Sequence, residues 1–311
     1  MGALLGALFL GGALGANDAA NVIGAAITTR AVAYRTGILL AAVCVLAGAW
    51  WGGARGLGAV GALGSQTHHS ALLITGAAAV AMSALLAVRL PASSSQAVVG
   101  AIVGVGLARG SGLDLSGLLR LGGGWILTPL GAALVALVFH AGLTAFTRRR
   151  PPRNLLRLDR SARLALLLAG GWAAYALGAN NAANVTGVFA GSGLLTTRAA
   201  ALVAGGSIAI GILAFGHRMM DLVGRDLVRL EPPTALVAML AQAVTVHFFA
   251  AHGMPVSMSQ AMVGGVLGIG LAKGVRTIDA RSLVQVLVGW IVMPLVAGLL
   301  GWVAVQVLGP A

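Results

Sequence analysis

The chain has 311 residues, of which 59% are hydrophobic and only 9% are charged. A water-soluble protein of this length needs more charged surface, so the composition indicates a polytopic membrane protein. The formal charge is +13, but the basic residues fall between apolar runs and aromatic residues are few, which favours cytoplasmic loops over nucleic-acid binding. The apolar runs lack the two-residue alternation of barrel strands, so we expect α-helices to cross the lipid bilayer.

The first predicted helix runs from Leu4 to about Thr29 and contains an unusual polar peptide, GANDAANVIG, at Gly15 to Gly24. Gly, Asn and Asp in succession disfavour a continuous helix, so we expect it to break or bend at Gly15 to Asn21. Asp18 is the only acidic residue in the middle of a membrane-length run. Burial of a carboxylate is costly unless a cation meets it, which makes Asp18 a candidate functional residue.

Two ordinary spans are predicted next, over roughly Gly37 to Trp51 and Ser70 to Val88. The peptide PASSSQ at Pro91 to Gln96 then precedes an apolar run that is too short and too glycine-rich for a full span. Proline and serines ahead of an apolar run are typical of a helix start, so we expect a re-entrant half-helix that begins inside the protein. The next run, from Asp114 to about Phe146, exceeds the thickness of the hydrocarbon core and should tilt or kink at Pro129.

A second copy of these elements follows an arginine- and proline-rich segment at Thr147 to Arg163. Gly178 to Gly187 reads GANNAANVTG, and SQAMVGGVLGIGLAKG from Ser259 matches SQAVVGAIVGVGLARG from Ser95. Paired interrupted segments at corresponding positions of two halves are typical of a transporter with its site near the membrane midplane. We therefore divide the chain into a first transmembrane repeat (1–146), a basic cytoplasmic linker (147–163) and a second transmembrane repeat (164–311).

The two half-helices offer neutral hydrogen-bond donors to an anion. A helix N-terminus carries about half a positive charge and presents unpaired N–H groups, which suits a tetrahedral oxyanion. Two such ends that face each other would surround the anion without Lys or Arg. The simpler interpretation, that the serines only cap helices, is weakened by the duplication and by a Gln in both copies. The candidate substrate-binding residues are Ser93, Ser94, Ser95, Gln96, Ser257, Ser259 and Gln260.

The GAND and GANN peptides offer side-chain oxygens, which are the ligands that hard cations such as Na⁺ prefer. Alternatively, the amides could hold helices together within the membrane. An anion site beside a cation site indicates a symporter, for which we expect no cofactor besides the coupling ion, Na⁺ or H⁺. The candidate sodium ligands are Asp18 and Asn181, and Asp18 could instead carry a proton. The full set of candidate coupling-ion residues is Asn17, Asp18, Asn21, Asn180, Asn181 and Asn184.

Two other functional classes are disfavoured. An anion channel predicts a continuous basic lining, and the buried Asp18 and the paired interruptions argue against one. A membrane enzyme needs a nucleophile or a set of metal ligands, and no buried His or Cys cluster supports either, so we do not expect catalysis.

The duplicated peptides resemble those of a known family. GANDAANVIG and GANNAANVTG, together with PASSSQAVVGAIVGVGLARG and PVSMSQAMVGGVLGIGLAKG, are similar to the paired signatures of the inorganic phosphate transporter (PiT) family. The resemblance covers both halves and implies an all-α inverted-repeat fold, a homodimer in the plasma (inner) membrane, and cation-coupled import of phosphate. It also implies that the serine-rich segments bind the anion and that the GAND segments serve the coupling ion.

The chain departs from that family at two points. Asn181 stands where the second signature commonly carries Asp, and the Ser-x-Thr pattern before the half-helices is all Ser in the first copy and Ser-Met-Ser in the second. Some relatives with altered signatures transport sulfate, so a sulfate permease of the same fold is the alternative. Phosphate keeps a proton at neutral pH and sulfate keeps none, so a phosphate site needs an acceptor as well as donors. Asp18, Gln96 and Gln260 could supply that acceptor, which favours phosphate.

Overall fold

The computed structural model describes residues 4–88, 92–149, 155–223, 231–274 and 280–309, and nearly all of this part of the chain is helical. Pro91, at the start of PASSSQ, lies outside the described residues. The first repeat contains α1 (Leu5–Ala19), the π-helical turn η2 (Ala20–Gly24), α2 (Ala25–Thr28), α3 (Tyr34–Gly52), α4 (Ala54–Gly61), α5 (His68–Ala87), α6 (Ser94–Arg109) and α7 (Leu115–Arg149). The second repeat contains α8 (Leu155–Gly191), α9 (Thr197–Val223), α10 (Pro232–Ala251), α11 (Met258–Lys273) and α12 (Ala280–Leu308).

Seven of the described helices are long and apolar enough to cross a membrane, namely α3, α5, α7, α8, α9, α10 and α12. The helices α6 and α11 have only 16 residues each. At 1.5 Å per residue this length falls short of a hydrocarbon core of about 30 Å, so both are half-helices. The prediction of a helical membrane fold with paired half-helices is confirmed.

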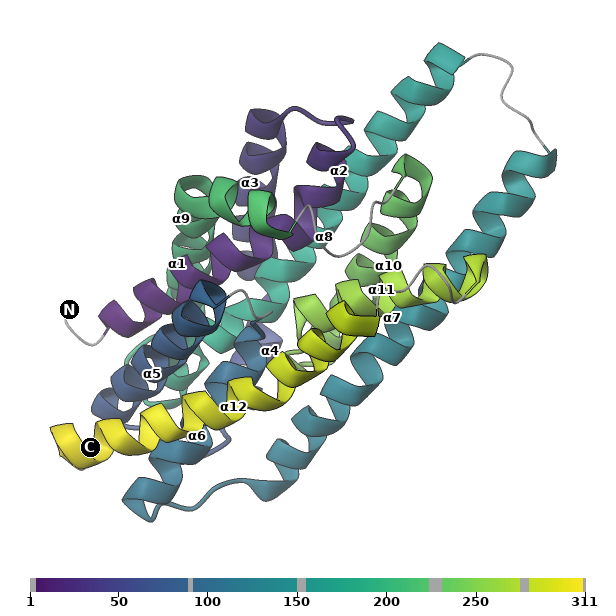
Figure 1. Cartoon of the computed structure of the whole chain (residues 1–311). Coiled ribbons are helices and arrows are strands. Elements are labelled where there is room, and N and C mark those ends of the chain that lie inside the picture. Colours follow the sequence, from purple (N-terminus) through teal and green to yellow (C-terminus); the bar gives the residue numbers. More distant parts are fainter. Residues whose placement is uncertain (1–3, 89–91, 150–154, 224–230, 275–279, 310–311) are drawn as a thin grey trace.

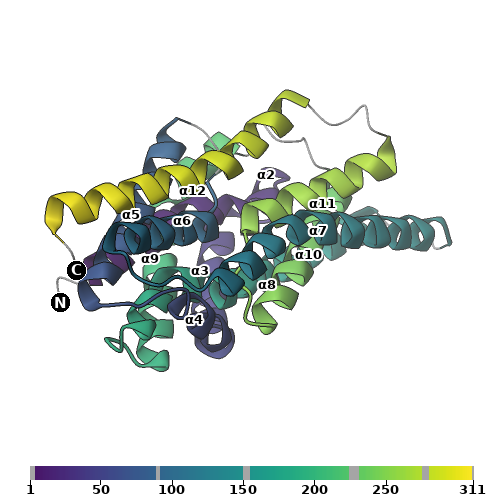
Figure 2. The ribbon, with the colours of Figure 1, turned by 90° about the horizontal axis from the view of Figure 1, so that it is seen from below.

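The helices form a scaffold and two arms, and each of these three bodies contains helices from both repeats. In the scaffold (α1, α3, α8 and α9), α1 packs on α9 and α3 packs on α8. The first arm consists of α5, α6 and α12, and the second arm consists of α10, α11 and α7. Figure 2 shows the helices of the first arm grouped on one side of the molecule and those of the second arm on the other. The equivalent helices of the two repeats are α1 and α8, α3 and α9, α5 and α10, α6 and α11, and α7 and α12. When each helix is replaced by its equivalent, the same set of contacts results, as expected for two repeats related by a two-fold axis.

Small residues hold each half-helix against the last helix of the other repeat. α6 packs on α12, and α11 packs on α7. A Cβ atom at Gly100 would collide with the carbonyl oxygen of Pro294, and one at Gly264 would collide with that of Pro129. The glycine-rich sequence of the half-helices therefore serves close helix packing.

The GAND and GANN peptides depart from the break that their composition predicts. Gly15 to Ala19 remain α-helical, and the interruption follows directly as the π-helical turn η2. GANN lies inside the continuous helix α8, so the break expected there is absent. Asn and Asp disrupt helices by competing for backbone groups, but here they bond to one another and to neighbouring segments. Gly15 and Gly178 instead allow close approach to Ile208 of α9 and to Val45 of α3.

The basic segment between the repeats is mostly helical, because α7 extends to Arg149 and α8 begins at Leu155. Arginine is a good helix former, and Arg163 pairs with Asp159 four residues earlier at 2.9 Å. Figure 1 shows the ends of α7 and α8 extending together beyond the other helices. The predicted boundaries at 146 and 164 fall within these helices, and the three-part division stays a prediction.

Candidate functional site

The candidate anion-binding residues lie where the two half-helices begin. Ser93 and Ser257 precede α6 and α11 in extended backbone conformation. Ser259 Oγ donates to the carbonyl oxygen of Ala92 at 3.5 Å, so the two starts meet inside the protein. Ser259 is partly buried, and the other candidates are buried, namely Ser93, Ser94, Ser95, Gln96, Ser257 and Gln260.

Both half-helix starts carry polar groups that lack a protein partner. Gln96 Oε1 and Gln260 Oε1, at equivalent positions in the two repeats, are buried without a hydrogen-bond partner among the described residues. Unpartnered buried acceptors are rare in native proteins. Beside each of them lies a pair of serine hydroxyls, 3.3 Å apart in the first copy and 3.0 Å apart in the second. The arrangement thus offers both donors and acceptors to a ligand.

The first signature places one carboxylate next to this junction. Asp18 is buried, and its Oδ1 accepts hydrogen bonds of 2.9 Å from Nδ2 of both Asn17 and Asn21. Asn21 can reach Asp18 because residues three apart on a helix are neighbours. Asp18 Oδ2 has no hydrogen-bond partner among the residues that the structure describes.

The second signature places the amide of Asn181 at the equivalent position. Its Oδ1 accepts from Asn184 Nδ2 at 2.7 Å and from Ser94 Oγ, at the start of α6, at 2.9 Å. Its Nδ2 donates to the carbonyl oxygen of Leu177 at 3.3 Å. An amide oxygen has two lone pairs, so both are engaged. A cation at Asn181 would have to displace Ser94 or Asn184.

Asn17 and Asn180 tie the scaffold to the peptides that precede the half-helices. Asn180 Nδ2 donates to the carbonyl oxygen of Val256 at 2.7 Å, and the Val256 N–H donates back to Asn180 Oδ1 at 2.8 Å. Asn17 Nδ2 lies 3.4 Å from the carbonyl oxygen of Ala92, the counterpart of Val256. Each signature therefore holds the start of one arm, and the predicted anion and cation residues share the junction of the scaffold with both arms.

The buried side chains described at this junction carry one negative charge and no positive charge. Among the buried residues that the structure describes, Asp18 is the only acidic one and none is Lys, Arg or His. The positive potential available to an anion therefore comes from the half-helix N-termini and from neutral donors.

Gln242 of α10 is a polar residue of this region that the sequence analysis missed. It is buried, its Nε2 donates to the carbonyl oxygen of Met258 at 3.3 Å, and its Oε1 has no partner among the described residues. Its counterpart in the first repeat is Ala78, so a search for duplicated polar residues passes over it. The signal that could have found it is a lone Gln within an apolar membrane-length run.

Comparisons with known proteins agree with the two repeats. The model of a family described as the phosphate transporter family matches the chain twice, at residues 14–160 and 155–301. A candidate phosphate permease of Methanocaldococcus jannaschii is 29% identical over 290 residues, which cover 93% of this chain and 91% of that protein. A sulfate permease of Bacillus subtilis is 30% identical over 305 residues, which cover 94% of this chain and 84% of that protein.

A solved structure of a sodium-dependent phosphate transporter has the same fold. Its TM-score is 0.88, and the match covers 99% of this chain and 98% of that chain at 18% sequence identity. At that identity the likeness speaks for the fold alone, whereas the family model covers nearly all of the sequence. The chain belongs to the phosphate transporter family.

Proposed function

We propose that the chain is a cation-coupled symporter that imports inorganic phosphate across the plasma membrane. The anion would lie between the N-termini of α6 and α11, and the coupling ion would lie beside Asp18. Membership of the phosphate transporter family supports the substrate class. The homodimer that the resemblance implies is part of the proposal.

The observation that carries the proposal is a buried carboxylate beside the proposed anion site, with no basic residue among the described buried residues. A phosphate dianion within about 6 Å of Asp18 is opposed by roughly 5 kcal/mol at an effective dielectric constant of 20. Helix N-termini and serine hydroxyls offset part of this repulsion, but the described buried residues include no basic side chain that could neutralise it. A cation that enters with the anion removes the repulsion. Coupling then follows from the charge of the site.

The coupling ion has one carboxylate oxygen available to it. Asn17 and Asn21 bond to Asp18 Oδ1 and thereby fix the orientation of the carboxylate, which leaves Oδ2 for Na⁺ or for a proton. Na⁺ is our first candidate, because the solved transporter of this fold is named as sodium-dependent. Asn181 uses its oxygen for two hydrogen bonds, so we place the cation on the Asp18 side.

Sulfate is the second candidate substrate, because the sulfate permease of Bacillus subtilis aligns over 94% of this chain. Hydrogen phosphate carries a P–OH donor and sulfate carries none. The buried oxygens of Gln96 and Gln260 lack partners among the described residues and could accept a hydrogen bond from that donor. Opposite sulfate neither oxygen would find a donor, whereas the P–OH of hydrogen phosphate would pair with one of them, a difference of about 1–3 kcal/mol, so we favour phosphate.

The proposal is tested by uptake of labelled phosphate and labelled sulfate into proteoliposomes, with Na⁺ and proton gradients imposed separately. We expect phosphate to accumulate when one of the two cation gradients is present. The double variant Ser95→Ala/Ser259→Ala should raise the half-saturating phosphate concentration at least tenfold, since a hydrogen bond to a charged group contributes about 1.5–3 kcal/mol.

The matched control is Ser116→Ala, which removes an exposed hydroxyl that bonds to Asp114 at 2.7 Å. It should leave uptake unchanged. Accumulation of sulfate in preference to phosphate would assign the chain to sulfate instead, and uptake that responds to neither gradient would rule out symport with these ions.

A further inference from the structure

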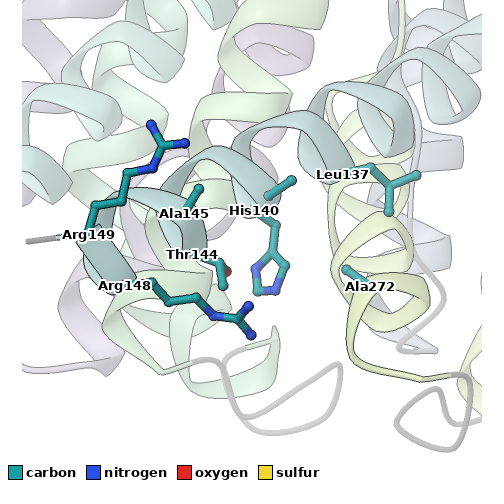
Figure 3. A pocket seen from close by; sticks show the side chains of 8 residues that line it. Leu137, His140, Thr144, Ala145, Arg148, Arg149 and Ala272 are labelled. Atoms are coloured by element: carbon teal, nitrogen blue, oxygen red, sulfur yellow. The ribbon is translucent and has the colours of Figure 1, made fainter.

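An open cavity of about 660 Å³ lies between the C-terminal third of α7 and the end of α11, away from the junction of the half-helices. It is lined by Leu137, His140, Ala141, Thr144, Ala145, Arg148, Arg149 and Ala272. One wall is apolar and the other is basic. Figure 3 shows His140, Thr144 and Arg148 along one side of α7, with Ala272 of α11 facing Leu137.

The cavity exists because α7 and α11 diverge. A Cβ atom at Gly264 or at Gly268 would collide with the backbone of α7, at Pro129 and at Ala133. One helical turn further on, Ala272 lines the cavity opposite Leu137 of α7. The close crossing thus ends in an open wedge, which the end of α11 places toward one face of the membrane.

The polar wall of the wedge is built to attract an anion. His140, Thr144 and Arg148 follow one another at four-residue spacing, so they share a face of α7. Helical side chains lean toward the N-terminus, which brings the Arg148 guanidinium back toward Thr144 and His140, as Figure 3 shows. Neither Arg148 nor Arg149 is paired with a carboxylate among the described residues. Two unpaired cations with a hydroxyl and an imidazole suit a phosphate group.

The imidazole of this wall has no counterpart in the second repeat. In the second repeat, α12 crosses α6 just as closely, since Gly100 and Gly104 meet Pro294 and Gly298. At the position of His140, however, α12 carries Val305. The two-fold relation of the repeats therefore reproduces the close crossing, but Val305 is buried where His140 lines the cavity. Arg148 and Arg149 lie at the end of α7, within the basic segment that the positive-inside rule assigns to the cytoplasm.

We propose that this wedge binds the headgroup of an anionic phospholipid of the cytoplasmic leaflet. The phosphate would contact His140, Thr144 and Arg148, and the start of the acyl chains would lie against Leu137 and Ala272. A free phosphate ion would contact only the basic wall, whereas a phospholipid would contact the basic wall with its headgroup and the apolar wall with its acyl chains. Basic pockets between transmembrane helices on the cytoplasmic side are suited to such headgroups.

The test is native mass spectrometry of the full-length protein in detergent, titrated with phosphatidylglycerol or with phosphatidylcholine of identical acyl chains. We expect phosphatidylglycerol to bind about 25-fold more tightly, from a factor of about five for each of two arginines. Arg148→Gln should reduce this preference about fivefold, and Arg148→Gln/Arg149→Gln should abolish it. Both side chains are exposed, so we expect the thermal unfolding of the variants without lipid to match that of the wild type.

The control is Arg163→Gln, which removes one positive charge from α8 in the same basic segment but outside the cavity. It should leave the preference for phosphatidylglycerol unchanged. Equal binding of the two lipids by the wild type, or an equal loss in Arg163→Gln and Arg148→Gln, would overturn the proposal. Displacement of phosphatidylglycerol by millimolar inorganic phosphate would assign the wedge to the free anion and contradict a lipid site.

Discussion

Equivalent positions of the two repeats carry a carboxylate at Asp18 and an amide at Asn181, in closely similar surroundings. Each side-chain oxygen accepts a hydrogen bond from the Asn three positions later. The surroundings differ in the donor from the opposite arm. Ser94 donates to Asn181, whereas Met258, the counterpart of Ser94, has no hydroxyl to offer Asp18. The oxygen of Asn181 therefore accepts a hydrogen bond from a serine hydroxyl, whereas Oδ2 of Asp18 has no hydrogen-bond partner among the described residues.

Asp18→Asn is expected to abolish concentrative uptake while leaving the protein folded. The amide oxygen can still accept the hydrogen bonds of Asn17 and Asn21, so local structure is kept, but the negative charge beside which we place the coupling cation is lost. Uptake against a gradient and the amount of folded protein in the membrane should be measured together. Full accumulation with the wild-type cation dependence would show that the coupling ion binds elsewhere.

Asn181→Asp is expected to make stability depend on the cation. The change places a carboxylate oxygen where Nδ2 now donates to the carbonyl oxygen of Leu177, at a cost of about 1–3 kcal/mol for the lost bond and the facing acceptors. A cation between the two oxygens would relieve that cost. We expect thermal unfolding in detergent to occur at a lower temperature without Na⁺ and to recover as Na⁺ is added. Equal stability of variant and wild type in both conditions would contradict this.

Most residues of the site could be predicted from the sequence because a polar residue also stands at the equivalent position of the other repeat, although Ser94 corresponds to Met258. Their mutual contacts could not be predicted, since Ser94 and Asn181 are 87 residues apart and meet only through the packing of an arm on the scaffold. Gln242 was not predicted because its counterpart in the first repeat, Ala78, is not polar. A comparison of the two repeats identifies the site residues that both share and misses those that only one repeat carries.

At the level of the helices, the position of α11 depends on its crossing with α7. Gly264→Ala should destabilise the protein by about 1–3 kcal/mol, because the new methyl group meets the Pro129 carbonyl oxygen, which belongs to the backbone and cannot rotate away. The control is Gly123→Ala in α7, where an added Cβ meets nothing within 4 Å. Thermal unfolding in detergent should separate the two variants. If Gly264→Ala unfolds at the temperature of the control, the crossing does not hold the half-helix.

Local sequence predicted where the half-helices begin but not how the signature helices continue. The serines before α6 and α11 are start signals that act within a few residues. In GANN, however, local propensity is overridden by tertiary contact, since the Asn180 side chain bonds to the backbone of Val256 and is thus unavailable to disrupt α8. Asn180, a residue type that disfavours helices, therefore connects two segments that are 76 residues apart.

For the whole molecule, the exchange of helices between repeats predicts that neither repeat folds as a monomer. Without the second repeat, α1 lacks α9 and α6 lacks α12. We expect chains cut within 150–154 to be degraded when either part is expressed alone, and the two parts to restore uptake when expressed together. Membrane abundance and phosphate uptake provide the measurement, with the intact chain as reference. A fragment that accumulates as a stable monomer would contradict the exchanged packing.

Because helices of each repeat pack on helices of the other, the way in which the repeats are encoded determines whether their equivalent positions can carry different residues. Two separate copies of one repeat, paired in opposite orientations, could reproduce this packing, but every substitution would then appear twice around the site. Replacing Asp by Asn would remove both carboxylates at once. A single carboxylate opposite an amide requires two halves that are encoded separately. A chain that carries both repeats meets this requirement, so the charge around Asp18 and Asn181 can change by one residue at a time.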